Sequence, residues 1–454
     1  MTLAHLLLPA LSAAIRPAAR AAASRVSRPS QLRLTADSLT RADVLIVGGG
    51  FGGLYTSLRL AALPSSPAVR LLDRADRFAF LPMLYEVTTG AVSCWEVAPR
   101  FDDLLEGSGV AFSEGEVVGL DARAGVATLA TTQGERALPF DHAVLAMGAE
   151  PSFGGVPGAD TLAMPFYSLN DALALRERLL PYARGAAGRA RLAVVGGSYV
   201  GVELAANLAD WLGDKVDISL IHRAEALLST SAEFSRMVAN ARLEERGVRV
   251  LLETSVQAVE RDGLVLESSS PAAHDGRLDV DLVVWCAGTQ PSRLARELGL
   301  PLDPRGRILV DEYLAVQGAP NLHALGDVAF ATDASGVVAP STAQAAMQQA
   351  DYAAWNVRAA LTGSKPLAFR YTALGEMLSL GGNDASVAAL AGLVQLQGPL
   401  ASASRRAVYA ARMPTVAQAA KVGASWALDV ALGAARAAMP PLRRGQRSDD
   451  RKGR

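Results

Sequence analysis

Two short apolar stretches stand out along the chain, because each is followed at once by glycines and then by a helical pattern. Residues 42–47 (ADVLIV) and 191–195 (RLAVV) have the composition of buried parallel strands. Apolar residues then recur at helical spacing over 54–63 and 202–212. The pattern predicts two strand–turn–helix units, and with them an α/β fold.

The first glycine turn has the spacing that dinucleotide binding requires. Gly48 permits a tight turn, Gly50 lets a pyrophosphate approach the backbone, and Gly53 lets the helix pack close to the strand. The next predicted strand, 69–73, ends at Asp73, whose carboxylate is placed to accept hydrogen bonds from ribose hydroxyls. The whole predicted binding turn consists of Gly48, Gly50, Phe51, Gly52 and Gly53.

The second glycine turn repeats the motif with two differences. Its residues are Gly196, Gly197, Ser198, Tyr199 and Gly201. Ser198 takes the place of the middle glycine, and the strand that follows leads into His222 and Arg223 instead of an acid. A carboxylate there would repel a 2′-phosphate, whereas Arg223 can pair with it. We predict NADPH in preference to NADH; the alternative is that His222 and Arg223 are solvated loop residues and the preference is slight.

Two dinucleotide folds in one chain, the second inserted in the first, predict a flavoprotein with FAD in the first site and the nicotinamide in the second. The fold class expected is therefore two Rossmann-like dinucleotide-binding domains. Residues 318–327 end in Gly326 and Asp327, and an aspartate there can bind the flavin ribityl chain. The residues further assigned to the two cofactor sites are Pro82, Val117, Ala146, Gly148 and Gly288. For Pro82, which would line the flavin, the competing interpretation is core packing.

Composition supports folded domains and excludes several classes of site. The chain has 454 residues, 50% of them hydrophobic and 20% charged, which is too long for one ordinary domain and too apolar for a disordered protein. Cys94 and Cys286 are too far apart for a CxxC pair, a Cys/His zinc site or a disulfide framework, so no metal is expected. No apolar run is long enough to predict a membrane span.

Charge is distributed unevenly along the chain. Residues 1–41 hold six basic side chains and one acid, and residues 405–454 hold eleven and three, which leaves an acidic body between them. An acidic body argues against a nucleic-acid binder. The Arg-, Ser- and Ala-rich first segment has the composition of an organellar transit peptide, with plastid and mitochondrion both open.

Taken together, these features resemble the type II NAD(P)H:quinone oxidoreductases, and among them the plant and cyanobacterial C-type members. The resemblance implies noncovalent FAD, reduction of a membrane prenylquinone without proton pumping, and monotopic attachment through the C-terminus. The prenylquinone would be plastoquinone, a demethylphylloquinone-like naphthoquinone or ubiquinone. The location implied is a chloroplast, at the thylakoid or plastoglobule surface, with the mitochondrial inner membrane as an alternative or second site. The matching stretches are 48–56 (GGGFGGLYT), 80–87 (FLPMLYEV), 92–101 (VSCWEVAPRF), 341–356 (STAQAAMQQADYAAWN) and 371–385 (YTALGEMLSLGGNDA).

The resemblance also suggests three catalytic candidates. Glu203 would lie by the nicotinamide and flavin, where it orients substrate or relays a proton; the alternative is a carboxylate favoured by the helix dipole. Gln344 and Gln348 are spaced to share one helix face, from which their amides can donate to a quinone carbonyl. Their alternative is an ordinary polar helix face.

The C-terminal region is predicted to form two helices, 399–412 and 415–435, that lie in a bilayer interface. Trp426 and Tyr409 are the expected anchors; the basic residues expected near lipid phosphates are Arg405, Arg406, Arg412 and Lys421. The competing interpretation is a helix pair that packs within the protein or forms a homodimer.

The predicted segments run in the following order: transit peptide 1–41, FAD domain 42–160, NAD(P)H domain 161–303, FAD domain with quinone site 304–385, membrane-interface segment 386–440, and disordered basic tail 441–454. Two other functions stay open, a soluble FAD-dependent electron transferase acting on a protein acceptor and a redox-signalling flavoprotein. A sulfide:quinone reductase is disfavoured because Cys94 and Cys286 are poorly placed for it, and a dithiol reductase is excluded by the missing CxxC pair.

Overall fold

The computed structural model describes residues 42–269 and 276–438, so the predicted transit peptide and basic tail lie outside the described residues. Both strand–turn–helix units form. β1 (Ala42–Val47) leads into α2 (Phe51–Ala61), and β9 (Ala190–Val195) leads into α8 (Tyr199–Leu212). The predicted α/β fold class is confirmed.

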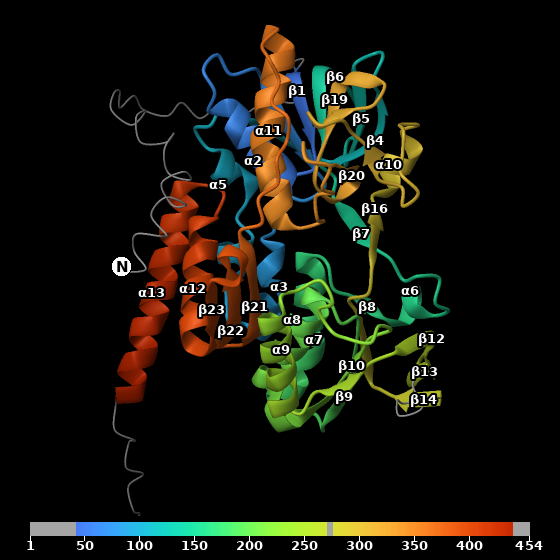
Figure 1. Ribbon diagram of the computed structural model, residues 1–454, viewed down its shortest axis with the longest axis vertical. Helices are drawn as coiled ribbons and strands as arrows, with labels where there is room; N and C mark the ends of the chain where they lie inside the picture. Colours follow the sequence, from blue (N-terminus) through green and yellow to red (C-terminus); the bar gives the residue numbers. More distant parts are fainter. Residues whose placement is uncertain (1–41, 270–275, 439–454) are drawn as a thin grey trace, which may run out of the picture.

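The first sheet combines segments from both halves of the chain (Figure 1). β1 lies centrally, parallel to β2 (Val69–Asp73) on one side and to β6 (Gly134–Leu145) on the other. Further strands extend the sheet: β3 (Ala111–Glu114), β4 (Glu116–Asp121), β5 (Val126–Thr131), β18 (Ala315–Val316) and β19 (Ala319–Ala324). Because β19 follows the second unit in sequence yet pairs with β6, the second unit is inserted in the first.

The second sheet is parallel throughout, in the order β11-β10-β9-β15-β8. Its strands are β8 (Met164–Pro165), β9, β10 (Val216–Ile221), β11 (Arg249–Leu251) and β15 (Leu282–Trp285). The helices of this unit besides α8 are α7 (Leu169–Ala183) and α9 (Glu233–Glu245). A small antiparallel sheet lies beside them, made of β12 (Thr254–Glu260), β13 (Gly263–Ser268) and β14 (Gly276–Asp279).

The two chain crossings between these units pair with each other. β7 (Ala149–Pro151) leaves the first unit and β16 (Thr289–Pro291) returns to it, and the two strands are antiparallel partners. Shorter elements connect the rest: η2 (Leu81–Met83), α3 (Leu84–Thr89), α4 (Cys94–Val97), α5 (Phe101–Leu105), α6 (Ala159–Leu162), η3 (Gly213–Lys215), α10 (Arg293–Glu297), β17 (Ile308–Leu309), η4 (Gly326–Val328) and β20 (Ala329–Phe330).

A third, C-terminal sheet covers the second unit. It consists of β21 (Gly375–Gly381), β22 (Asp384–Ala389) and β23 (Val394–Gln397), with the turn η5 (Leu390–Gly392) between the last two. β21 packs against α8, while α12 (Gly398–Ala411) packs on β22. The segment predicted as membrane-interfacial from residue 386 therefore begins within this sheet, before the two helices.

The two predicted C-terminal helices are present as α12 and α13 (Val416–Ala438). α13 packs against α12 and α4, and both helices stand at one side of the molecule in Figure 1. Within residues 42–269 and 276–438, no helix combines the length and apolar character that crossing a bilayer needs.

Candidate active site

The first glycine turn is fixed by packing at its outer residues and faces open space at its middle one. A Cβ at Gly48 (φ +101°) would lie 2.4 Å from the carbonyl oxygen of Ala146, and a Cβ at Gly53 would lie 1.8 Å from that of Gly48. A Cβ at Gly50 would meet nothing within 4 Å. α2 starts directly after Gly50, and no side chain in the described residues caps it. The turn therefore fits a pyrophosphate, the group that FAD would present here.

Phe51 and Gly52 serve the packing under this turn. The ring of Phe51 lies edge-on to Phe78 and Phe80, with centroid distances of 5.1 and 5.2 Å. A Cβ at Gly52 would lie 2.4 Å from Cδ1 of Leu325. The side chain of Phe51 thus belongs to the core, which leaves its backbone N–H to face a cofactor.

Two aspartates flank the first site. Oδ2 of Asp73 accepts a hydrogen bond from the N–H of Gly49 at 2.6 Å, and Oδ1 accepts one from Ala75 at 2.8 Å. Burial raises the pKa of both Asp73 and Asp327. The carboxylate of Asp327 has no hydrogen-bond donor among the described residues, so it is available to a hydroxyl-bearing ligand such as the ribityl chain.

The other predicted flavin-site residues lie in the first unit. Val117 and Ala146 are buried, and Pro82 is half-buried in η2. Gly148 has a φ of +66°, and a Cβ there would lie 3.9 Å from the hydroxyl oxygen of Tyr167. Burial, and then the charge of Asp327, raise the pKa of Tyr167 to about 12. Sequence reasoning missed Tyr167, because no spacing or motif marks it.

The second glycine turn repeats the geometry of the first. A Cβ at Gly196 (φ +114°) would lie 2.8 Å from the carbonyl carbon of Cys286, and a Cβ at Gly201 would lie 1.8 Å from the carbonyl oxygen of Gly196. Ser198 stands at the start of α8, which no side chain in the described residues caps. Gly288, with a φ of +86°, lies near this site at the return crossing. The turn fits a second pyrophosphate.

His222 takes the structural place of Asp73. Its Nδ1 accepts a hydrogen bond from the N–H of Gly197 at 3.1 Å, as Asp73 accepts one from Gly49. Burial and the neighbouring Arg223 lower the pKa of His222, so the imidazole is neutral and carries its hydrogen on Nε2. Arg223 is exposed. A nucleotide bound at this turn would meet a cation and no carboxylate from these two positions.

Glu203 is buried on α8 where three parts of the chain meet. Its Oε1 accepts hydrogen bonds from the hydroxyl of Tyr85 at 3.1 Å and from the N–H of Ser379 at 2.8 Å. Burial raises the pKa of Glu203 to about 7, although the Ser379 bond and the charge of Arg405 oppose the shift. A carboxyl group with such a pKa can hold or release a proton near neutral pH.

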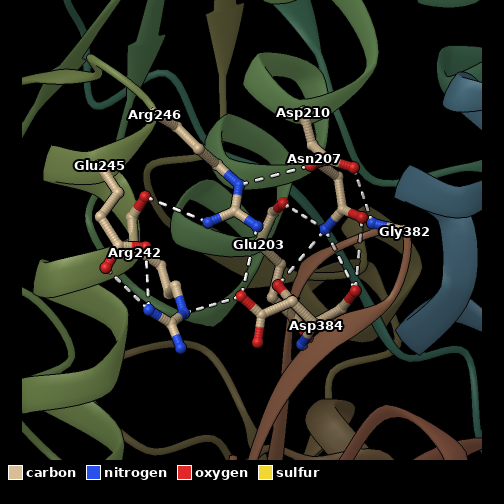
Figure 2. Close-up of polar contacts among 9 residues, drawn as sticks. Glu203, Asn207, Asp210, Arg242, Glu245, Arg246, Gly382 and Asp384 are labelled. Carbon is tan, nitrogen blue, oxygen red and sulfur yellow. Dashed lines mark hydrogen bonds and ion pairs between the residues drawn. The ribbon is translucent and has the colours of Figure 1, made fainter. Parts of the chain in front are cut away.

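Figure 2 shows how the third sheet is held against α8 and α9. The amide of Asn207 donates to Oγ of Ser379 at 3.2 Å. Asp210 accepts from the N–H of Gly382 at 2.9 Å. Asp384 pairs with Arg242 at 2.7 Å and Arg246 at 3.2 Å. These contacts fix β21, and with it the Ser379 N–H that bonds to Glu203.

Both predicted glutamines lie on α11 (Ala343–Thr362), a helix that Thr342 caps and Gly363 ends. Nε2 of Gln344 donates to the carbonyl of Gly375 at 3.2 Å, and Nε2 of Gln348 donates to that of Thr372 at 2.8 Å. Their neighbour Gln349 is buried, and its Oε1 accepts from the N–H of Gly326 at 2.7 Å. Gln349 thereby ties α11 to the turn that carries Asp327, a role that the sequence motif did not separate from those of its neighbours.

The strand β21 and the loop before it contact the predicted quinone helix, the second glycine turn and Glu203. Gln344 bonds to Gly375, and Ser379 bonds to Glu203. Glu376 accepts from the hydroxyl of Tyr199 at 2.5 Å and from the N–H of Ala232 at 2.9 Å. The predicted quinone helix, the second glycine turn and Glu203 are thus brought together by one strand.

Two side chains expected at a lipid surface are instead buried. Arg405 is 2% exposed at its side chain, where it pairs with Glu86, and Trp426 is 5% exposed. Arg405 also donates to the hydroxyl of Tyr85 at 3.1 Å. The prediction was wrong for both because helical spacing alone does not tell which face of an amphipathic helix meets the protein. Cys286 is half-buried directly after β15.

The chain matches known proteins over most of its length. The model of the pyridine nucleotide-disulphide oxidoreductase family matches residues 42–350. The chain is 41% identical over 391 residues to demethylphylloquinone reductase NdbB of Synechocystis sp., which covers 85% of this chain and 96% of that protein. It is 38% identical over 420 residues to alternative NAD(P)H-ubiquinone oxidoreductase C1, chloroplastic/mitochondrial, of Arabidopsis thaliana, covering 85% of this chain and 80% of that protein.

A solved structure with the same fold is that of NDH2 from Plasmodium falciparum in complex with NADH. The TM-score is 0.73 at 18% sequence identity, and the match covers 84% of this chain and 96% of that chain. At this identity the likeness shows the fold alone.

Proposed function

We infer that this chain, which belongs to the pyridine nucleotide-disulphide oxidoreductase family and within it to the type II NAD(P)H:quinone oxidoreductases, oxidises NAD(P)H and reduces a quinone through bound FAD. The observation that carries this conclusion is the convergence on β21 of Glu203, the second glycine turn and the helix with Gln344. When bound, FAD supplies the redox chemistry that links the nicotinamide to the quinone.

The residues of the chain bind and orient the substrates and transfer the proton. Tyr85 and Ser379 hold one oxygen of Glu203, while Oε2 has no hydrogen-bond partner among the described residues. We assign to Oε2 the proton that accompanies turnover. Gln344 and Gln348 each donate one amide N–H to a backbone carbonyl. The second N–H of each amide can therefore donate to a quinone carbonyl.

The nucleotide donor is proposed to be NADPH in preference to NADH. Neutral His222 makes the backbone bond that a carboxylate makes in the first site, so no negative charge from this position opposes a 2′-phosphate. Exposed Arg223 can pair with that phosphate.

Attachment to a membrane is proposed through the outer surface of the C-terminal segment. Large apolar side chains are exposed there. Arg412, directly after α12, and Lys421 on α13 are not fully buried. These residues replace Arg405 and Trp426 in the proposed lipid contact. The exposed apolar residues are Leu390, Leu393, Leu400, Val408, Val416, Leu428 and Val430.

The acceptor is proposed to be a prenylquinone, and the location a plastid, with the mitochondrion as the alternative. The names of the relatives support this: one is a demethylphylloquinone reductase, and the other is an NAD(P)H-ubiquinone oxidoreductase described as chloroplastic/mitochondrial.

Steady-state kinetics test the proposed reaction. The full chain loaded with FAD is given NADPH under anaerobic conditions with a short-chain plastoquinone analogue. We expect NADPH oxidation that depends on the quinone. Oxidation that proceeds only when a ferredoxin-type protein replaces the quinone would instead identify a soluble electron transferase.

A further inference from the structure

A buried arginine from the C-terminal helix α12 contacts the hydrogen-bond network of Glu203. Arg405 is 2% exposed at its side chain, and its Nη2 donates to Oε1 of Glu86. Its Nη1 donates to the hydroxyl oxygen of Tyr85 at 3.1 Å, and that hydroxyl donates to Oε1 of Glu203 at 3.1 Å. The guanidinium also lies over the rings of Tyr85 and Tyr409, at 6.0 and 5.2 Å from their centroids.

The direction of these hydrogen bonds follows from the chemistry of arginine. A guanidinium carries donors only and does not lose its proton in proteins. The hydroxyl oxygen of Tyr85 must therefore accept from Arg405, which leaves the single hydrogen of Tyr85 for Glu203. In this way a residue far along the chain fixes which way the hydroxyl next to Glu203 points.

Charge balance indicates that Arg405 does more than neutralise Glu86. Arg406 binds the other oxygen of Glu86, Oε2, at 3.2 Å, and its guanidinium lies over Trp426. Glu86 therefore has a second cation, and part of the field of Arg405 acts on Glu203. The other ionisable groups nearest to Glu203 are Tyr85 and Glu86 on α3, Tyr409 on α12, Tyr199 on α8 and, through Tyr199, Glu376 on β21.

We propose that Arg405 is a positioning residue for the reaction: through the Tyr85 hydroxyl it orients Glu203 and sets the pH at which Glu203 exchanges its proton. The proposal rests on the proposed function for its catalytic meaning. It makes the C-terminal segment, for which the sequence favoured a membrane surface over packing within the protein, part of the active site.

The test compares Arg405→Met with the matched control Arg406→Met in the full, FAD-loaded chain. Arg406 contacts the same carboxylate as Arg405, but the arginine that donates to the Tyr85 hydroxyl is Arg405. Two readouts are followed against pH: the rate of NADPH oxidation, and the infrared band of the protonated Glu203 carboxyl, identified by its loss in Glu203→Gln. We expect both midpoints to rise by about one pH unit in Arg405→Met, since a cation and an oriented donor no longer favour the carboxylate. Arg405→Lys, which keeps the positive charge, should show a smaller rise of both midpoints than Arg405→Met.

Arg406→Met should leave both midpoints in place. Equal shifts in the two variants, or no shift in Arg405→Met, would overturn the proposal. Should Arg405→Met fail to retain FAD, Tyr85→Phe replaces it, and an unchanged infrared midpoint in that variant rejects the proposal. Because the infrared titration needs no quinone, it separates this result from a failure of the proposed reaction.

Discussion

Side chains at corresponding positions of the two glycine turns make the same backbone hydrogen bond with opposite electrostatic consequences. Asp73 accepts the N–H of Gly49 with a carboxylate oxygen, whereas His222 accepts the N–H of Gly197 with Nδ1 of a neutral imidazole. The histidine therefore keeps the turn in shape without bringing a negative charge to it. In the proposed function, the neighbouring Arg223 is the residue that distinguishes NADPH from NADH.

Replacing Arg223 tests this assignment. Arg223→Ala should lower kcat/KM for NADPH by about ten- to a hundredfold, since a charge-assisted hydrogen bond is lost, and leave NADH nearly unchanged. The comparison variant is Arg261→Ala, which removes an exposed arginine from the turn between β12 and β13. A parallel loss with both nucleotides would show that Arg223 does not contact the 2′-phosphate.

The raised pKa of Glu203 predicts how stability changes with pH. Since its pKa is about 7 when folded and near 4.5 when unfolded, the folded chain holds the proton more tightly, and stability falls as pH rises between these values. Glu203→Gln lacks this titrating carboxyl group. The free energy of unfolding of the variant in urea, measured relative to that of the native chain, should therefore rise by roughly 3 kcal/mol between about pH 5 and about pH 8. A constant difference across this range would contradict the assigned pKa.

At the scale of elements, local patterns were sufficient for the two strand–turn–helix units and for the two C-terminal helices. Strand, turn and helix follow one another directly there, so apolar spacing and glycine positions specify them. The contacts that assemble the site could not be obtained in this way. Ser379 meets Glu203 only because β21 packs on α8, and Arg405 meets Tyr85 only because α12 packs on β22. No sequence spacing records such distant partners.

Two glycines in the same turn should respond differently to alanine. Gly50→Ala leaves the packing intact, because its Cβ has open space, but occupies the path of the pyrophosphate. We expect a folded protein with FAD affinity reduced on the order of tenfold or more. Gly53→Ala forces a Cβ onto the carbonyl oxygen of Gly48 and should cost at least about 3 kcal/mol. Flavin content and thermal unfolding of both variants distinguish these outcomes, and equal flavin loss with equal destabilisation would contradict them.

At the scale of the whole molecule, the C-terminal segment has a face buried against the protein and a face exposed to solvent. Its inner face carries Arg405 and Trp426 into the protein, and its outer face exposes side chains such as Val416, Leu428 and Val430. A truncation before α12 would remove both faces together. Substitutions on the outer face alone are therefore the better probe of membrane attachment.

The triple variant Val416→Ser, Leu428→Ser, Val430→Ser tests the outer face. Less apolar area is available for burial in a bilayer, so binding to vesicles that contain anionic lipid should fall by at least about tenfold. Turnover with a water-soluble quinone analogue should stay the same, because none of these side chains contacts the Glu203 network. Vesicle co-sedimentation measures the first quantity; undiminished binding would place the membrane contact elsewhere.

The most direct test of the central claim, that one flavin site serves both a nicotinamide and a quinone, is anaerobic stopped-flow absorbance in two stages. NADPH is first mixed with the FAD-loaded chain, and a short-chain plastoquinone analogue is then added. We expect the flavin absorbance to bleach rapidly with NADPH, more slowly with NADH, and to return rapidly with the quinone. Bleaching without recovery would contradict quinone reduction, and no bleaching with either nucleotide would contradict the second nucleotide site itself.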